Sequence, residues 1–247
     1  METKVSELKR EVRALFKGNW LTAVQVTLVP ALFKVLTMFF ILILTAIIAY
    51  IFMQPNFQPT LKSITDTPVH VNNGGEFVWQ IFSNIPGVLI GGLLTAGISF
   101  TFLDWLQQPK INIEHPFKLA FQSFTSRYIG PVLLLALMMY IFTILWSLLL
   151  VIPGIVASYS YRMTYYIYRD HQTDTDWHTL DYIRASKVMM RGAKVRLFYL
   201  DLSFIGWHLL SVLLLGIPEF WVMPYQAATN AAFYHHLQQQ REANVQN

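Results

Sequence analysis

Long apolar stretches, separated by short polar segments, make up most of this chain. A helix rises about 1.5 Å per residue, so roughly 20 apolar residues cross a hydrocarbon core of about 30 Å. The stretches predict about six transmembrane helices, at residues 20–53, 77–105, 129–151, 154–168, 195–215 and 219–234. The first is so long that it must tilt, kink near Pro30 or project, and the second is expected to be interrupted at Pro86. The pattern predicts an all-α fold, a polytopic membrane helix bundle.

One unit occurs three times: a basic amphipathic stretch, a long apolar span, an Ile-Pro break and a second span that ends in polar residues. The breaks are Ile85-Pro86, Ile152-Pro153 and Ile217-Pro218, and the polar ends are Asp104, Asp170 and His235. Stacked copies of one unit bury a common core. We therefore predict three tandem repeats, each an amphipathic elbow helix plus a helix pair, within a single membrane domain that covers 1–247. The repeat units lie at about 1–106, 112–170 and 174–238.

Basic residues are concentrated on one side of the predicted bundle. Residues 1–19, 104–128 and 169–196 and the C-terminal tail carry fifteen Lys and Arg, whereas Lys62 stands alone on the other side. Cytoplasmic loops of membrane proteins carry such an excess. Both termini are therefore predicted to be cytoplasmic in a multi-pass protein of the cell (cytoplasmic) membrane, with an extracytoplasmic loop at about 54–76.

Composition agrees with a membrane protein and excludes some classes. Hydrophobic residues make up 54% of the chain and charged residues 13%, which is too apolar for one soluble core. The net charge of +4 is confined to one side of the membrane, so no nucleic-acid partner is expected. The chain has no cysteine, which excludes disulfides and thiolate metal sites. The N-terminus lacks the short apolar core of a signal peptide.

The basic amphipathic stretches contain candidate contacts for anionic lipid. Apolar positions such as Leu8 and Phe16 in the first stretch, and Trp177 and Ile183 in the third, recur at helical spacing between cations. A cationic flank beside an apolar face is typical of helices in the headgroup layer. The predicted lipid contacts are Lys9, Arg10, Arg13, Lys17, Arg184, Lys187, Arg191 and Lys194. An elbow that only sets the entry of the next helix explains the same pattern.

A few ionisable residues fall inside the predicted spans. An unpaired charge is costly in the membrane, so such residues are candidates for function. The candidate intramembrane polar site is Arg162, Asp201, Lys34, Tyr159 and Tyr161, with Arg162 and Asp201 expected to pair. A ligand or ion path is one interpretation, and a structural ion pair or a snorkelling arginine is the other. Glu219, at the outer turn, is expected to be solvated.

Glycines and histidines suggest two further hypotheses. Gly87, Gly91, Gly92 and Gly97 cluster on the second span, with a GxxxG step at 87 and 91, which favours close packing of this span against another helix. Four histidines on the predicted cytoplasmic side could gather around a metal with Asp174 or Asp176. They are His171, His178, His235 and His236. No metalloprotease, nucleophile-elbow, phosphate-loop or dinucleotide motif occurs, so no catalytic residue, metal or cofactor is expected.

Several motifs carry a resemblance to a known family. They are ELK at 7–9 with KGNW at 17–20, VIPGI at 151–155, YSYRM at 159–163, AS at 185–186 with MMRG at 189–192, LDLSFIGW at 200–207, PY at 224–225 and AAFY at 231–234. Along its whole length the chain resembles the bacterial integral membrane family called domain of unknown function 975, known from Gram-positive bacteria such as lactobacilli and streptococci. It is also distantly similar to the membrane domain of some glycerophosphodiester phosphodiesterases. The resemblance implies a fold and a membrane location but no activity.

Three classes of function fit these features. The favoured one is a non-enzymatic membrane protein whose helix pairs enclose a polar-lined groove that binds or transports a lipid or small amphiphile. It predicts a pocket beside Arg162 and Asp201. A scaffold or regulatory partner of another membrane protein predicts a dry, well-packed interior and an exposed apolar patch rich in small residues. A membrane-bound enzyme requires converging ionisable groups, such as His171 and Asp174 with His235. Membrane lipids are the expected partners, with another membrane protein in the second class.

Overall fold

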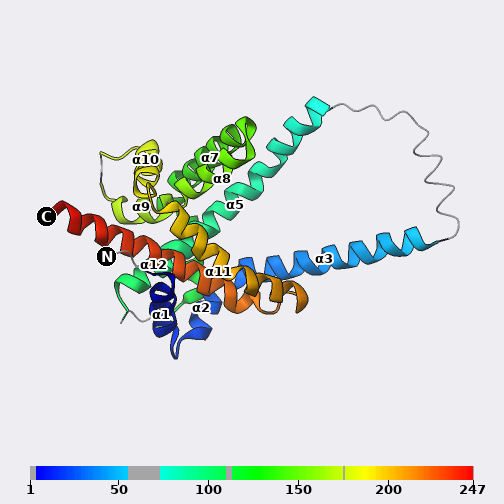
Figure 1. Ribbon diagram of the computed structural model, residues 1–247, viewed down its shortest axis with the longest axis horizontal. Helices are drawn as coiled ribbons and strands as arrows, with labels where there is room; N and C mark the ends of the chain where they lie inside the picture. The colour runs from blue at the N-terminus through cyan, green and yellow to red at the C-terminus, as the bar shows by residue number, and fades with distance from the viewer. Residues whose placement is uncertain (1–3, 55–72, 110–112, 175, 247) are drawn as a thin grey trace.

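The computed structural model describes residues 4–54, 73–109, 113–174 and 176–246, which form helices and connecting turns with no strand among them (Figure 1). The all-α fold predicted from the sequence is therefore confirmed. The α-helices are α1 (Val5–Phe16), α2 (Trp20–Val26), α3 (Leu28–Met53), α5 (Asn73–Gln107), α6 (Pro116–Ala120), α7 (Ser126–Leu149), α8 (Val151–Tyr161), α9 (Thr164–His171), α10 (Thr179–Met189), α11 (Lys194–Leu213) and α12 (Glu219–Gln246), and a 3-10 turn covers Gln122–Phe124.

Four helices are long and apolar enough to cross a membrane: α3, α5 from Trp79 onward, α7 and α11. The other two predicted spans differ from expectation. The fourth is divided at Arg162 and Met163 into α8 and α9, of 11 and 8 residues. The sixth, α12, continues past residue 234 to Gln246, and the whole helix is more polar than a span. The described residues thus contain four candidate spans where six were predicted.

Some prolines mark the places where helices begin, whereas Pro86, Pro131 and Pro224 lie inside helices. α2 and α3 separate at Thr27, and Pro30 lies in the first turn of α3, where the missing N–H interrupts no helical bond. Pro153 lies in the first turn of α8, and Pro218 directly precedes α12. α5, by contrast, runs through Pro86 without interruption, so the predicted break there is wrong. Helices in apolar surroundings tolerate an internal proline when the freed groups find other partners.

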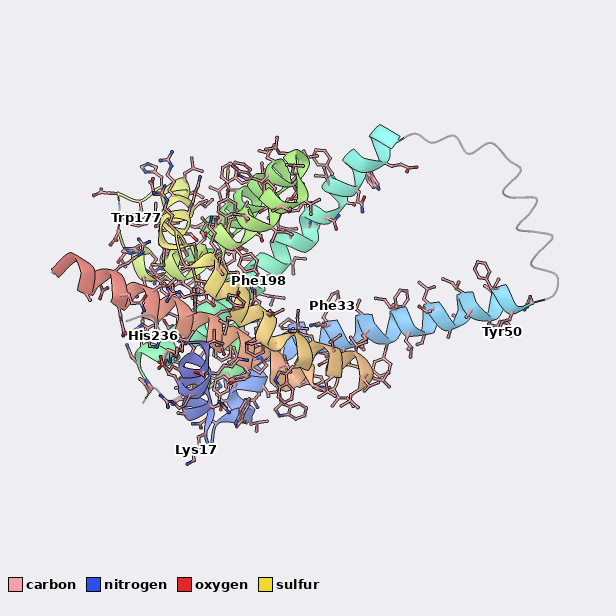
Figure 2. All side chains as sticks on the ribbon, viewed as in Figure 1. Lys17, Phe33, Tyr50, Trp177, Phe198 and His236 are labelled. Atoms are coloured by element: carbon pink, nitrogen blue, oxygen red, sulfur yellow. The ribbon has the colours of Figure 1, made fainter. Side chains whose placement is uncertain are left out.

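α3 projects from the bundle on its own (Figure 1). Every side chain from Phe39 to Met53 is exposed, and Figure 2 shows Tyr50 pointing away from the helix near its far end. Its 26 residues extend roughly 39 Å, more than the hydrocarbon core of about 30 Å. The long first stretch therefore both breaks, at Thr27, and projects. Most of the predicted loop at 54–76 lies outside the described residues, and 73–76 belong to the first turn of α5.

α12 is the central helix of the bundle, with α1, α2, α3, α5 and α11 packed against it. Its segment from Ala228 to Tyr234 is buried throughout. α1 turns Leu8, Val12 and Phe16 towards this core, where the Phe16 ring lies 5.6 Å from that of Trp105. The apolar face that was predicted to lie in the headgroup layer is therefore covered by protein, which favours the elbow interpretation of α1.

Charged and polar contacts join the C-terminal ends of α5 and α9 to each other and to the middle of α12. Arg169 donates to both carboxylate oxygens of Asp104, at 3.2 and 2.7 Å. The hydroxyl of Tyr234 donates to Asp170 at 2.6 Å. Bidentate arginine–carboxylate pairs are among the strongest charge-assisted contacts. The polar ends Asp104 and Asp170 therefore lie at the same end of the bundle as Tyr234, next to His235.

Two glycines of α5 allow close packing, but they are not those of the GxxxG step. No described atom lies within 4 Å of the position that a Cβ would take at Gly87 or Gly91. A Cβ at Gly92 would lie 2.7 Å from that of Ala136 on α7. A Cβ at Gly97 would collide with the carbonyl oxygen at the end of α6. The predicted close packing is therefore found at Gly92 and Gly97, and not at the GxxxG step.

Candidate functional site

Asp201, on α11, joins three other side chains of the predicted polar site and its surroundings. Its carboxylate accepts a hydrogen bond from the hydroxyl of Tyr159 at 3.0 Å and lies 3.7 Å from Nη2 of Arg162. Nε2 of Gln226, on α12, donates to it at 3.3 Å. The structure therefore brings Arg162 and Asp201 together. Arg162 lies at the break between α8 and α9, not in mid-helix as the sequence suggested.

The same network continues along α11 and α12 to α3. Nε2 of His208 lies 3.0 Å from Oε1 of Gln226, and Nδ1 of His208 lies 2.9 Å from Oε1 of Glu219. Nζ of Lys34 also lies 2.9 Å from this carboxylate oxygen. Glu219 is only 2% exposed, so the expectation that it is solvated is wrong. We name the connected set Lys34, Glu219, His208, Gln226, Asp201, Tyr159 and Arg162 the polar chain.

The hydrogen-bond roles along the polar chain place one proton between His208 and Glu219. Gln226 donates to the Asp201 carboxylate through Nε2, which leaves its Oε1 to accept from His208. The other ring nitrogen faces Glu219. The contact therefore places a hydrogen between this ring nitrogen and the carboxyl group of Glu219.

A spacing of seven residues builds the polar chain. Asp201 and His208 are seven apart on α11, and Glu219 and Gln226 are seven apart on α12. Seven residues make about two helical turns, so each pair lies on one face of its helix. The turn at 214–218 makes the two helices antiparallel, which sets Asp201 beside Gln226 and His208 beside Glu219. Sequence reasoning missed His208 and Gln226, although this shared spacing was a signal that could have found them.

A cavity of about 590 Å³, here named the Arg162 cavity, opens beside Arg162. α5, α7, α8, α9, α12 and the junction of α2 and α3 form its walls. The lining is apolar at Val88, Ile98, Ala136, Met139, Met223 and Ala227, and polar at Thr27, Ser99, Tyr140, Tyr161, Tyr165, Tyr166 and Asn230. Pockets for small molecules commonly enclose roughly 300–1,000 Å³. Tyr161 thus faces this cavity, while Tyr159 faces Asp201.

Two buried polar atoms in the Arg162 cavity have no hydrogen-bond partner among the described residues. They are Oγ1 of Thr27 and Oδ1 of Asn230, whose residues are 0% and 8% exposed. Leaving such an atom unpaired costs about 1–3 kcal/mol. A polar group that reached these buried atoms from the cavity would pair with them, and the Arg162 guanidinium would attract an anionic group. The arrangement suits a ligand with a polar head and an apolar body.

The predicted lipid cations divide by exposure. Those exposed to solvent are Arg10, Arg13, Lys17, Arg184, Lys187 and Arg191, and those partly buried are Lys9 and Lys194. Lys17 points away from the molecule in Figure 2. Nζ of Lys9 instead donates to the carbonyl oxygen of Ser203 at 3.2 Å and lies 4.1 Å from the centre of the Phe204 ring. Their role in lipid binding stays a prediction.

The histidines considered for a metal site have separate partners. His171 lies 2.8 Å from Asp174, and His236 lies 2.6 Å from Glu11 on α1. The hydrogen bond with Glu11 raises the pKa of His236, against the opposing effect of burial. His235 contacts Gln239 on its own helix. In the described part of the chain, no three His, Asp or Glu side chains form a metal-binding group.

Comparison with known proteins gives one family match. The model of a family described as "Protein of unknown function (DUF975)" matches residues 1–164 and 147–241. No curated protein and no solved structure matches the chain. The distant similarity to the membrane domain of glycerophosphodiester phosphodiesterases therefore stays a prediction.

Proposed function

Because this chain belongs to the DUF975 family, described as of unknown function, we propose a function from the geometry of its site. The protein is a non-enzymatic integral membrane protein that binds a lipid or small amphiphile in the Arg162 cavity and moves it within or across the membrane. The observation that carries this proposal is the cavity itself, with one cation, two unpartnered oxygens and apolar walls. The polar chain supports it, because Asp201 and Tyr159 lie behind Arg162 and hold its head group at the cavity edge.

The proposed membrane arrangement has both termini in the cytoplasm. The excess of Lys and Arg supports it, since α1, α10 and the C-terminal end of α12 all lie towards one end of the molecule (Figure 1). The order of elements supports the three repeats. A short helix, a long helix and a returning segment follow one another as α1, α3 and α5, then as α6, α7 and α8 with α9, and then as α10, α11 and α12.

Native mass spectrometry of the full chain, released from mild detergent, tests the proposed ligand site. Wild type is expected to retain a bound lipid or metabolite, and Arg162→Gln is expected to lose it. Asp201→Asn removes the charge beside Arg162 and is expected to weaken retention. Arg127→Gln makes the same charge change at an exposed guanidinium at the start of α7, outside the cavity, and is expected to keep the ligand.

Thermal unfolding of each purified variant shows whether it is folded. A folded Arg162→Gln variant that still retains the ligand would place the binding site elsewhere. An empty wild type, or an equal loss of ligand from Arg127→Gln, would remove the basis for the proposal and return the polar chain to a structural role.

One observation favours a scaffold or regulatory partner of another membrane protein as the second candidate. The segment from Phe39 to Met53 presents apolar side chains on all sides of α3. Helices in membranes associate by close packing at small residues, and Ala46 and Ala49 supply small side chains on this segment. The chain has no cysteine, so Leu44→Cys creates a unique labelling site on this segment. Protection of that thiol from a lipid-soluble maleimide in native membranes, but not after purification, would support a partner; equal labelling in both would argue for contact with lipid alone.

A further inference from the structure

A second hollow, of about 530 Å³, lies between α1, α2, α11 and α12. It shares no lining residue with the Arg162 cavity. Trp20, Trp207 and Trp221 line it together with Tyr225, and aliphatic side chains such as Leu210 complete the walls. Trp207 and Trp221 are each 52% exposed, so the hollow is open along its side. We name it the tryptophan groove.

Two cations of α1 mark one end of the tryptophan groove. Lys9 and Arg13 line it one helical turn apart, and the Tyr225 hydroxyl donates to the carbonyl oxygen of Lys9 at 3.2 Å. Ile217 and Pro218 line the groove at the start of α12, about two turns or 10–12 Å from Tyr225. The groove therefore runs from a cationic end to an apolar end.

The charge at the cationic end meets neutral protein groups, since Lys9 donates to the carbonyl oxygen of Ser203 and lies over the Phe204 ring. Among the described residues, no carboxylate lies within 4.0 Å of the head group of Lys9 or Arg13. Arg13 instead donates from Nε to the carbonyl oxygen of Lys9 at 3.3 Å. Burial, and then the charge of Arg13, lower the pKa of Lys9. An anion between the two head groups would stabilise both charges.

We propose that the tryptophan groove binds an anionic phospholipid, with one acyl chain along the tryptophan walls and the phosphate against Lys9 and Arg13. This site is distinct from the Arg162 cavity and does not depend on the function proposed there. It also gives two of the predicted lipid cations a specific task, while Arg10 and Lys17 on the same helix do not line the groove.

The dimensions and chemistry of the groove select this occupant. A helix of another protein is about 10 Å across and is too wide for a hollow of this volume. A small soluble anion would leave the apolar length beyond Tyr225 unfilled. Tryptophan and tyrosine are the side chains that favour the level of lipid headgroups, where one end is apolar and the other polar. A phospholipid, with an acyl chain and an anionic headgroup, fills both parts of the groove.

Quenching of tryptophan fluorescence by brominated lipids tests the proposal. The full chain is reconstituted in vesicles that contain either brominated phosphatidylglycerol in phosphatidylcholine or brominated phosphatidylcholine in phosphatidylglycerol, at the same mole fraction. Tryptophans that only face the bilayer are quenched equally by the two lipids. The groove is expected to add a preference of about tenfold for the anionic lipid, since each nearby cation strengthens binding several-fold. The double variant Trp207→Phe/Trp221→Phe removes two reporters and is expected to remove most of the preference.

Matched charge variants distinguish the groove from the general attraction of a basic surface. Lys9→Gln/Arg13→Gln is expected to lose the preference, and Arg10→Gln/Lys17→Gln, with the same charge change on the same helix, is expected to keep it. Wild type without a preference, or equal losses in both double variants, would overturn the proposal. Should Lys9→Gln/Arg13→Gln fail to fold, Leu210→Phe narrows the groove without altering charge or adding a tryptophan; an unchanged preference in that variant would also overturn the proposal.

Discussion

The carboxylate of Glu219 and the ammonium group of Lys34 meet at 2.9 Å between α12 and α3. Only Ala31 and Val35 of α3 are buried, so few other contacts hold this projecting helix to the bundle. Glu219 is buried while the Lys34 side chain is 48% exposed. The ion pair therefore anchors the base of α3. Its anion is enclosed by protein, whereas the exposed part of its cation can also be stabilised by the environment of the protein.

Glu219→Gln is expected to lower the free energy of unfolding by about 1–3 kcal/mol. The change leaves Lys34 and His208 facing a neutral amide, and removing one partner of a buried pair costs about 3–5 kcal/mol, less where the other partner is exposed. Titration with a denaturing detergent, followed by circular dichroism, measures the loss. Lys34→Gln should cost less, since Glu219 keeps His208. Equal losses would show that the partners contribute alike.

Gly97→Ala is expected to destabilise the protein by about 1–3 kcal/mol. The new methyl group would meet backbone at the end of α6, which cannot move away as a side chain can. Gly87→Ala, on the same helix, meets no described atom and is expected to stabilise by about 0.5–1 kcal/mol, because alanine loses less backbone entropy than glycine in a helix. The melting temperatures of the two variants should shift in opposite directions.

These two glycines illustrate what the sequence could predict. The lengths of the apolar stretches predicted where the long helices run. A helix that crosses a membrane must match the thickness of the hydrocarbon core, whatever its tertiary contacts are. Close packing depends on the rotation of α5 against its neighbours, which a local motif does not contain. Gly92 and Gly97 lie on the packed side of α5, whereas the GxxxG pair at Gly87 and Gly91 does not.

The candidate site was predictable in the same unequal way. A charge within an apolar stretch needs a partner, so Arg162 and Asp201 were predicted to pair from their positions alone. Glu219 was misjudged because its place at a helix start suggested a solvated turn, whereas α3 brings Lys34 over it. The Arg162 cavity depends on how α5, α7 and α12 pack, and no spacing in the chain predicts that.

The stability of the protein is expected to decrease as the pH rises above about 6.5, because the contact between His236 and Glu11 weakens. The hydrogen bond at 2.6 Å favours the charged imidazole in the folded state and so raises its pKa above the unfolded value of about 6.5. The pair's contribution is then fully present below that value and is lost as the pH rises through the raised pKa.

The melting temperature of the full chain, recorded from about pH 5.5 to 8.5, measures this contribution of His236. His236→Gln should flatten the curve on the alkaline side. His115→Gln, at an exposed histidine that caps α6 without a side-chain bond, should keep the wild-type curve. A His236→Gln curve parallel to wild type would show that the contact between α1 and α12 does not titrate in this range.

The Arg162 cavity predicts opposite effects on stability and on ligand binding for two conservative changes. Asn230→Leu and Thr27→Val replace buried polar groups whose oxygens lack partners in the described chain by apolar groups of similar size. Each is expected to raise the free energy of unfolding of the ligand-free protein by about 1 kcal/mol, because an unpaired buried oxygen is removed. Each should also weaken retention of the ligand, since the polar head loses a partner. Thermal unfolding combined with native mass spectrometry measures both.

Thr143→Val, at a cavity hydroxyl that already donates to the carbonyl oxygen of Met139, is the matched control and should leave retention unchanged. If Asn230→Leu and Thr27→Val lower both stability and ligand retention, the two oxygens serve the fold and not a ligand. A gain in stability together with a loss of ligand is the expected result, because binding sites are often maintained at a cost in stability.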